Sequence, residues 1–234
     1  PTAAISRLIF KSLQASSMMN SESARQQMVE QQVRTWDVFD ELVLETMSAV
    51  PRDRFVPPAF AHCAYADAEI PLANGQCMLR PSIAGRILQA VRAVATDKVL
   101  EVGTGTGYLT ECLARMADSV TSIDIFEEFT GAAAQRLEDR GVRNVDLRCM
   151  DATKELPAGA YDCVIVTASM AKMDSRLVDK LTPGGRLFVV IGEPPAMTAT
   201  LVRRGEQDGT MAEDLFETHI PPMVAEPEAP VFLF

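Results

Sequence analysis

Three alternating glycines follow an apolar, strand-like run in the segment from Lys98 to Tyr108, KVLEVGTGTGY. Gly103, Gly105 and Gly107 have no Cβ and can adopt positive φ at little cost. A ligand can therefore lie directly against the backbone where a strand turns into a helix. The run predicts a nucleoside-binding turn, and a tight strand-to-helix turn without a ligand is the alternative.

Acidic residues stand at the ends of three successive strand-like runs: Glu101, Asp124 and Asp151. In an open α/β sheet, ligands bind beyond the carboxyl ends of the strands. A carboxylate at Asp124 could accept hydrogen bonds from both hydroxyls of a ribose, and Asp151 is placed to meet an adenine amino group. Each acid alone could equally be a turn residue or a helix cap. Together with the glycines, they favour a nucleoside site.

The glycine spacing distinguishes between two classes of nucleoside cofactor. NAD-binding proteins use G-x-G-x-x-G and bind a pyrophosphate at a helix N-terminus, which makes an NAD dehydrogenase the less favoured alternative here. This chain has E-x-G-x-G-x-G, which is typical of S-adenosylmethionine (SAM) methyltransferases. Carboxylates and carbonyl dipoles also suit the sulfonium cation of SAM. The predicted cofactor-binding residues are Glu101, Gly103, Thr104, Gly105, Gly107, Asp124, Ile125, Asp151 and Ala152.

Strand-like and helical segments alternate through the part of the chain that must position these residues. Apolar runs predict strands at residues 99–102, 120–123, 145–148, 163–166 and 187–191. This alternation predicts a doubly wound α/β fold, with a parallel sheet covered by helices on both faces. Two further runs, at residues 199–203 and 215–220, flank the turn-rich GEQDG and predict a C-terminal antiparallel hairpin.

Helical periodicity precedes the first strand. Residues 21–47 predict two short helices interrupted around residues 35–37, and residues 82–94 predict a third helix. We expect residues 1–17 to be a leader or N-terminal extension and residues 18–234 to form a single domain. Within it, residues 18–81 would be a helical cap, 82–204 the cofactor-binding core and 205–234 a C-terminal strand and tail. The proline-rich residues 221–230 predict an extended surface segment.

Composition excludes several other classes of protein. The formal net charge of −10 and the lack of a long basic run argue against a nucleic-acid partner. The five cysteines are widely spaced and only two histidines are present, so we expect no metal site. No apolar run approaches the roughly 18 residues of a membrane span. A cytoplasmic location is expected, and the oligomeric state stays open.

Several local motifs resemble the protein-L-isoaspartate O-methyltransferase family. AVPRDRFVP and IPLANGQ look like the segment before its cofactor motif, and VLEVGTGTGYLT, YDCVIVTAS and LTPGGRLFVVIGE follow in the family's order. The resemblance implies a seven-stranded, Rossmann-like methyltransferase sheet. It also implies protein repair, in which a methyl group passes from SAM to a carboxylate of a damaged aspartyl residue.

One departure concerns the loop that the resemblance assigns to the substrate. Family members carry Thr-Ile-Ser there, and this chain carries Cys77, Met78 and Leu79, so both hydroxyls are missing. Arg80 could anchor a carboxylate instead, or it could be a solvated surface residue. The resemblance thus implies catalytic positions at Cys77 and Leu79, with Leu79 at the position of the family serine and expected to be non-functional. Arg80 is the candidate replacement, and Thr167 follows the strand-like run at residues 163–166, where the substrate side of such a pocket is usually built.

A carboxylate acceptor is already ionised at pH 7, so methyl transfer to it needs no strong general base. His62 and His219 are therefore expected to be structural. We predict a SAM-dependent O-methyltransferase acting on an isoaspartyl or a related, altered carboxylate of a protein or peptide. The alternative is a SAM-binding protein of the same fold without isoaspartyl activity, acting on an unknown small molecule or through a partner.

Overall fold

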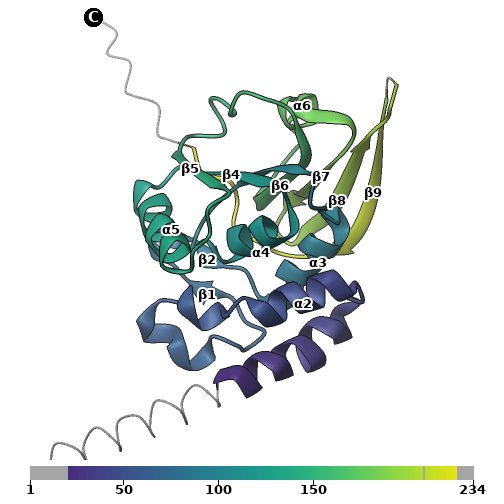
Figure 1. Cartoon of the computed structure of the whole chain (residues 1–234). Helices are drawn as coiled ribbons and strands as arrows, with labels where there is room; N and C mark the ends of the chain where they lie inside the picture. The colour runs from purple at the N-terminus through teal and green to yellow at the C-terminus, as the bar shows by residue number, and fades with distance from the viewer. Residues whose placement is uncertain (1–20, 208, 226–234) are drawn as a thin grey trace, which may run out of the picture.

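The computed structural model describes residues 21–207 and 209–225 of the 234-residue chain, and its centre is a seven-stranded sheet (Figure 1). The strand order is β5-β4-β3-β6-β7-β8-β9, with parallel pairing from β5 to β7 and antiparallel pairing of β8 and β9. The bounds are β3 (Lys98–Val102), β4 (Ser119–Asp124), β5 (Val145–Cys149), β6 (Tyr161–Met170), β7 (Leu181–Glu193), β8 (Ala196–Arg204) and β9 (Thr210–Glu217).

The predicted α/β sheet and the C-terminal hairpin are both confirmed. The run predicted at residues 215–220 was misplaced, because β9 pairs with β8 from Thr210 and ends at Glu217. Polar residues at the start of β9 carry little apolar signal, and most of them are exposed. Their strand conformation comes from backbone pairing along β8 rather than from burial.

Alternating side chains of the central strands divide the core between the two faces of the sheet. In β6, Cys163 and Ile165 pack with one cluster, whereas Val164 and Val166 pack with the other. Helices α3 (Pro81–Val91), α4 (Tyr108–Met116) and α5 (Glu127–Asp139) contribute to the first cluster, and the short α6 (Ser175–Asp179) contributes Leu177 to the second.

The N-terminal cap packs on α3 and α4, on the side of the molecule away from α6 (Figure 1). Residues 21–27 are helical, and the helix continues through η1 (Met28–Val33) and η2 (Arg34–Trp36). It ends at Asp37, which has a left-handed φ of 60°, so the predicted interruption is confirmed. The Asp40 side chain then accepts a hydrogen bond from the backbone N–H of Val43 and caps α2 (Glu41–Ala49).

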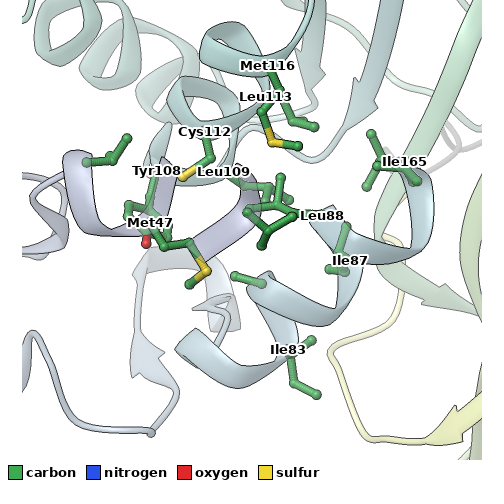
Figure 2. Packing of buried hydrophobic residues seen from close by; sticks show 14 of the residues in the cluster. Met47, Ile83, Ile87, Leu88, Tyr108, Leu109, Cys112, Leu113, Met116 and Ile165 are labelled. Carbon is green, nitrogen blue, oxygen red and sulfur yellow. The ribbon is translucent and has the colours of Figure 1, made fainter. Parts of the chain in front are cut away.

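Apolar side chains hold the cap against the core (Figure 2). Met47 of α2 meets residues from α3 and α4 in one continuous cluster that includes Ile83, Ile87, Leu88, Leu109, Cys112 and Leu113. Helix α3 stops at Val91, three residues before the predicted end, because Arg92 adopts a left-handed φ of 45°. The cap is thus anchored to the two helices that flank β3.

Between the cap helices and α3, the chain forms several short elements. These are η3 (Arg52–Arg54), η4 (Pro58–Cys63), β1 (Ile70–Pro71), η5 (Ala73–Gly75) and β2 (Cys77–Met78). Strands β1 and β2 pair antiparallel, with Ile70 opposite Met78 and Pro71 opposite Cys77. This small hairpin sets the position of residues 77–79.

Residues 1–17 lie outside the described residues, so their assignment as a leader or extension stays a prediction. Within residues 21–207 and 209–225, none of the helices is long and apolar enough to cross a membrane. The same residues contain no group of His, Cys, Asp or Glu side chains arranged to hold a metal ion.

Candidate functional site

A pocket opens at the carboxyl ends of β3, β4 and β6, where the sequence predicts the nucleoside site. One wall is the glycine turn after β3, and a second is formed by residues that follow β4 and β5. The cap loop and the segment after β9 complete it. Of the predicted site residues, those that line it are Cys77, Leu79, Gly103, Thr104, Gly105, Asp124, Ile125, Ala152 and Thr167.

The glycine turn requires Gly103 for two separate reasons. Its φ of +102° is rarely adopted by other residues, and a Cβ at this position would lie 2.1 Å from Oγ1 of Thr167. That Oγ1 can donate to the carbonyl oxygens of Val102 (3.1 Å) and Gly103 (2.9 Å), so Thr167 holds the turn against the end of β6. The predicted catalytic position Thr167 therefore also shapes the predicted cofactor wall.

The other two glycines have different surroundings. Gly105, with φ of +52°, lies on the pocket wall, and a Cβ there would meet only Leu72, at 4.0 Å. Gly107 lies behind the wall as the N-cap of α4, where a Cβ would come within 3.0 Å of Ala133 in α5. Gly107 thus permits close helix packing, whereas Gly105 leaves the pocket open.

Asp124 stands at the end of β4 with its carboxylate at the pocket wall. Its Oδ2 accepts from the N–H of Gly105 (2.9 Å) and its Oδ1 accepts from the N–H of Phe126 (3.0 Å). Burial raises the pKa of Asp124, and these backbone donors oppose that shift. Because each carboxylate oxygen has two acceptor sites, both retain capacity for ligand hydroxyls.

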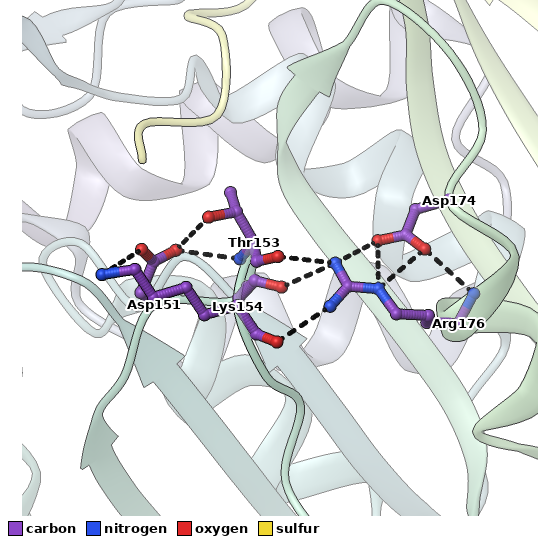
Figure 3. Close-up of polar contacts among 6 residues, drawn as sticks. Asp151, Thr153, Lys154, Asp174 and Arg176 are labelled. Atoms are coloured by element: carbon purple, nitrogen blue, oxygen red, sulfur yellow. Dashed lines mark hydrogen bonds and ion pairs between the residues drawn. The ribbon is translucent and has the colours of Figure 1, made fainter. Parts of the chain in front are cut away.

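Asp151 lies behind the wall formed by the loop after β5 (Figure 3). Its Oδ1 accepts from the N–H and Oγ1 of Thr153, and Lys154 lies 3.6 Å from its Oδ2. Arg176 donates to the carbonyl groups of the same loop and pairs with Asp174 (Figure 3). These contacts fix the loop that brings Ala152 to the pocket, and adenine binding by Asp151 stays a prediction.

Glu101 is fully buried beneath the glycine turn, off the pocket wall. Its Oε2 accepts from Oγ1 of Thr110 (2.5 Å) and Oγ of Ser122 (2.6 Å), whereas its Oε1 has no hydrogen-bond partner among the described residues. Ser122 also bonds Oγ1 of Thr104 at 2.6 Å, which links Glu101 to the pocket wall. Burial raises the pKa of Glu101 to about 7, despite the two hydroxyl donors.

This raised pKa predicts a pH-dependent stability of the cofactor-free protein. The unfolded carboxyl titrates near its ordinary pKa of 4.5 and the folded one near 7, so unfolding becomes easier as the pH rises across that window. At about 1.4 kcal/mol per unit, the loss is about 3 kcal/mol. Glu101→Gln should abolish this loss, measured by denaturant unfolding at about pH 4.5 and about pH 8.

Glu45→Gln is the matched control, because Glu45 is exposed on α2. It should keep the pH dependence of the wild type. An equal pH dependence in Glu101→Gln and the wild type would contradict the prediction.

Comparison with known proteins identifies the family. Residues 23–226 match the profile described as protein-L-isoaspartate(D-aspartate) O-methyltransferase. The chain is 34% identical to protein-L-isoaspartate O-methyltransferase 2 of Pelobacter propionicus over 210 residues, which cover 89% of this chain and 93% of that protein. This chain belongs to the protein-L-isoaspartate(D-aspartate) O-methyltransferase family. A relative in Opitutus terrae is 38% identical over 169 residues, or 72% of each chain.

Solved structures with related names share the fold. A putative protein-L-isoaspartate O-methyltransferase of Plasmodium falciparum, solved with S-adenosyl-L-homocysteine, superposes with a TM-score of 0.73 at 18% identity. The aligned region covers 86% of this chain and 98% of the Plasmodium falciparum chain. A second protein-L-isoaspartate O-methyltransferase structure also superposes with a TM-score of 0.73, at 21% identity. The aligned region covers 86% of this chain and 66% of that chain. The Rossmann-like methyltransferase fold predicted from the resemblance is therefore confirmed.

The loop that differs from the family's Thr-Ile-Ser run lies on the pocket wall. Cys77, Met78 and Leu79 line it and present a thiol and two apolar side chains. Burial, with the nearby Glu69 carboxylate, raises the pKa of Cys77 to about 11, so this thiol stays protonated near neutral pH. None of the three side chains carries a hydroxyl.

Arg80 points away from this wall. It is the N-cap residue of α3 and donates to Glu69 at 3.3 Å, with a third of its side chain exposed. Of the four predicted catalytic positions, Arg80 alone lies off the pocket lining. In this arrangement Arg80 is paired with Glu69, and a catalytic role for it stays a prediction.

Two parts of the pocket were not predicted from the sequence. Arg52 lines it from η3, although it lies in the AVPRDRFVP motif that supports the resemblance. The segment Pro221–Val224, predicted only as an extended surface segment, is partly exposed and also lines the pocket. Ser169 of β6 holds this segment by accepting from the N–H of Met223 and donating to the carbonyl of Pro221, both at 2.9 Å. Residues 226–230 lie outside the described residues.

Proposed function

We propose that this chain is a SAM-dependent O-methyltransferase that methylates the free carboxylate of isoaspartyl residues in proteins or peptides. The observation that carries the proposal is the Asp124 carboxylate beside the open Gly105 turn, in a chain of this family. The names of its relatives support the same activity. The Plasmodium falciparum structure, solved with S-adenosyl-L-homocysteine, supports SAM as the cofactor.

The residues present fit SAM. Asp124 would accept from the ribose hydroxyls, Ile125 and Ala152 would contact the adenosine, and the turn from Gly103 to Gly105 would lie along the methionine part. SAM supplies an electrophilic methyl group on a sulfonium when it is bound. A carbonyl-rich turn with a buried carboxylate beneath it is a favourable environment for that cation.

The protein's part in the reaction is to orient the acceptor and to exclude water. The acceptor carboxylate is ionised at pH 7, so no side chain has to remove a proton from it. The cap loop at Leu72 and Gln76–Leu79 and the segment Pro221–Val224 line the pocket together with the glycine turn. They would enclose the acceptor and align its oxygen with the methyl group.

We also propose a protein or peptide as the partner and the cytoplasm as the location. The cysteines of the described residues, Cys63, Cys77, Cys112, Cys149 and Cys163, are all free thiols. Free thiols are usual in a reducing compartment. The net charge of −10 supports an acceptor other than nucleic acid.

The second candidate is a SAM-binding protein of the same fold that does not methylate isoaspartyl residues. The apolar wall at Met78 and Leu79 favours it, because no hydroxyl there can hold the acceptor carboxylate. Such a protein would act on another acceptor, a small molecule included, or through a partner.

Two measurements separate these candidates. Calorimetry should show that SAM binds, and an isoaspartyl hexapeptide should then incorporate label from methyl-labelled SAM as a base-labile ester. The same peptide with ordinary aspartate is the matched control and should stay unlabelled. Cofactor binding without labelled peptide would favour the second candidate, and a lack of SAM binding at millimolar concentration would contradict both.

A further inference from the structure

Arg52 is a buried arginine that forms no ion pair within the described part of the chain. Its side chain is fully buried in η3. Nε donates to the carbonyl of Ala64 (3.0 Å) and Nη2 donates to the carbonyl of Leu79 (2.8 Å). Its Nη1 forms no hydrogen bond, and no carboxylate of the described residues forms an ion pair with the guanidinium. One of its donor groups is therefore unused.

The hydrogen-bond and ring partners of this charge are neutral. The guanidinium carbon lies 5.1 Å from the ring centroid of Tyr108. Asp67 is the one carboxylate that raises the pKa of Arg52, and its two oxygens accept from the N–H and Oγ of Ser82. Burial lowers the pKa of Arg52, yet a guanidinium stays charged near neutral pH. A buried cation with an unused donor group destabilises the fold until an anion accepts a hydrogen bond from that group.

The position of Arg52 indicates where that anion would come from. Arg52 lines the pocket, and the carbonyl it binds belongs to Leu79, the position of the family's serine. The guanidinium therefore lies beside the loop from which the two hydroxyls are missing. A guanidinium presents its donors in a planar fork that matches a carboxylate.

We propose that Arg52 binds the carboxylate that receives the methyl group, through its free Nη1. This inference rests on the proposed function. One carboxylate oxygen accepts from Nη1 and the other attacks the methyl carbon. The new C–O bond forms as the S–C bond of the sulfonium breaks, and the products are a neutral ester and a neutral thioether. Loss of the anionic charge weakens the contact with Arg52, which favours release of the methylated product.

The test compares two peptides in the presence of S-adenosylhomocysteine. One hexapeptide carries an isoaspartyl residue, and in the other the free carboxylate of that residue is replaced by its uncharged amide. Calorimetry on the wild type should show at least about tenfold tighter binding of the acid, as a charged hydrogen bond would give. In Arg52→Gln, the ratio of the affinities for the acid and the amide should fall close to one. Arg52→Lys should keep part of it, because the charge remains without the fork.

Arg54→Gln is the matched control, since Arg54 is exposed in the same short helix. It should keep the full preference. The preference is a ratio within one variant, so a lower folded fraction of Arg52→Gln does not change it. Arg52→Gln weakening both peptides equally, or a wild type that does not prefer the acid, would overturn the inference.

The cofactor also has a carboxylate, on its methionine part. If Arg52→Gln lowers the affinity for S-adenosylhomocysteine by about tenfold or more while the acid preference survives, Arg52 binds that carboxylate and the assignment to the acceptor is wrong. Labelling with methyl-labelled SAM separates this from failure of the proposed function. An unmethylated acid peptide would contradict the function, whereas methylation with an unchanged preference in Arg52→Gln would contradict the inference alone.

Discussion

Gly103→Ala should lower the affinity for S-adenosylhomocysteine by at least about 100-fold, which corresponds to about 3 kcal/mol. Two costs combine at this position. A φ of +102° is costly for alanine, and the new Cβ would lie 2.1 Å from Oγ1 of Thr167. Backbone strain of this kind costs about 1 to 3 kcal/mol. The clash adds to it by pushing apart the turn and the end of β6, and calorimetry measures the loss.

Two further variants identify the cause. Gly103→Ala combined with Thr167→Ala removes the clashing oxygen but keeps the strained φ, so it should recover part of the lost affinity. Gly131→Ala is the matched control, because a Cβ at Gly131 in α5 meets nothing within 4 Å. It should bind the cofactor as the wild type does. Gly103→Ala with unchanged affinity would mean that the turn does not contact the cofactor.

Cys77→Thr combined with Leu79→Ser should raise kcat/KM for an isoaspartyl peptide by about tenfold to a hundredfold. A hydrogen bond to a charged group contributes about 1.5 to 3 kcal/mol, and a contact made in the transition state appears in kcat/KM. Both positions line the pocket, and Leu79 adjoins the Arg52 guanidinium through its carbonyl. The initial rate of labelled ester formation measures the gain.

Cys77→Val combined with Leu79→Ala is the matched control, because it makes nearly the same changes of size without adding a hydroxyl. It should show no gain. If both double variants gain equally, space rather than hydrogen bonding limits the wild type. If neither gains, the hydroxyls are not what the pocket lacks, and Arg52 already supplies the necessary contact.

Part of the candidate site followed from local patterns. The position of Asp124 after an apolar run and the spacing of the glycines predict a ligand beyond the ends of neighbouring strands. The structure places Asp124 and Gly105 in direct hydrogen-bond contact there. Parallel pairing brings the ends of β3 and β4 to the same edge of the sheet, so the pattern of the strands alone predicts that these residues meet.

Glu101 and Asp151 show why the same pattern was not sufficient. Both stand at strand ends, yet Glu101 turns inward to Thr110 and Ser122, and Asp151 turns to Thr153 and Lys154. A strand end places the backbone of a residue at the edge of the sheet. The Glu101 side chain turns to donors that α4 and β4 bring close to it, which sequence spacing does not record, whereas Asp151 turns to partners two and three residues further on in its own loop.

The sequence by itself determined the order of the main strands, the parallel core and the glycine turn, because periodicity, glycine spacing and strand-end acids are local properties. Only the tertiary structure placed Arg52, which is separated by 27 residues from its partner Leu79, and returned Pro221–Val224 to the pocket. Their contacts join segments that are distant in the chain, and no local pattern records which distant carbonyl or side chain a residue will meet.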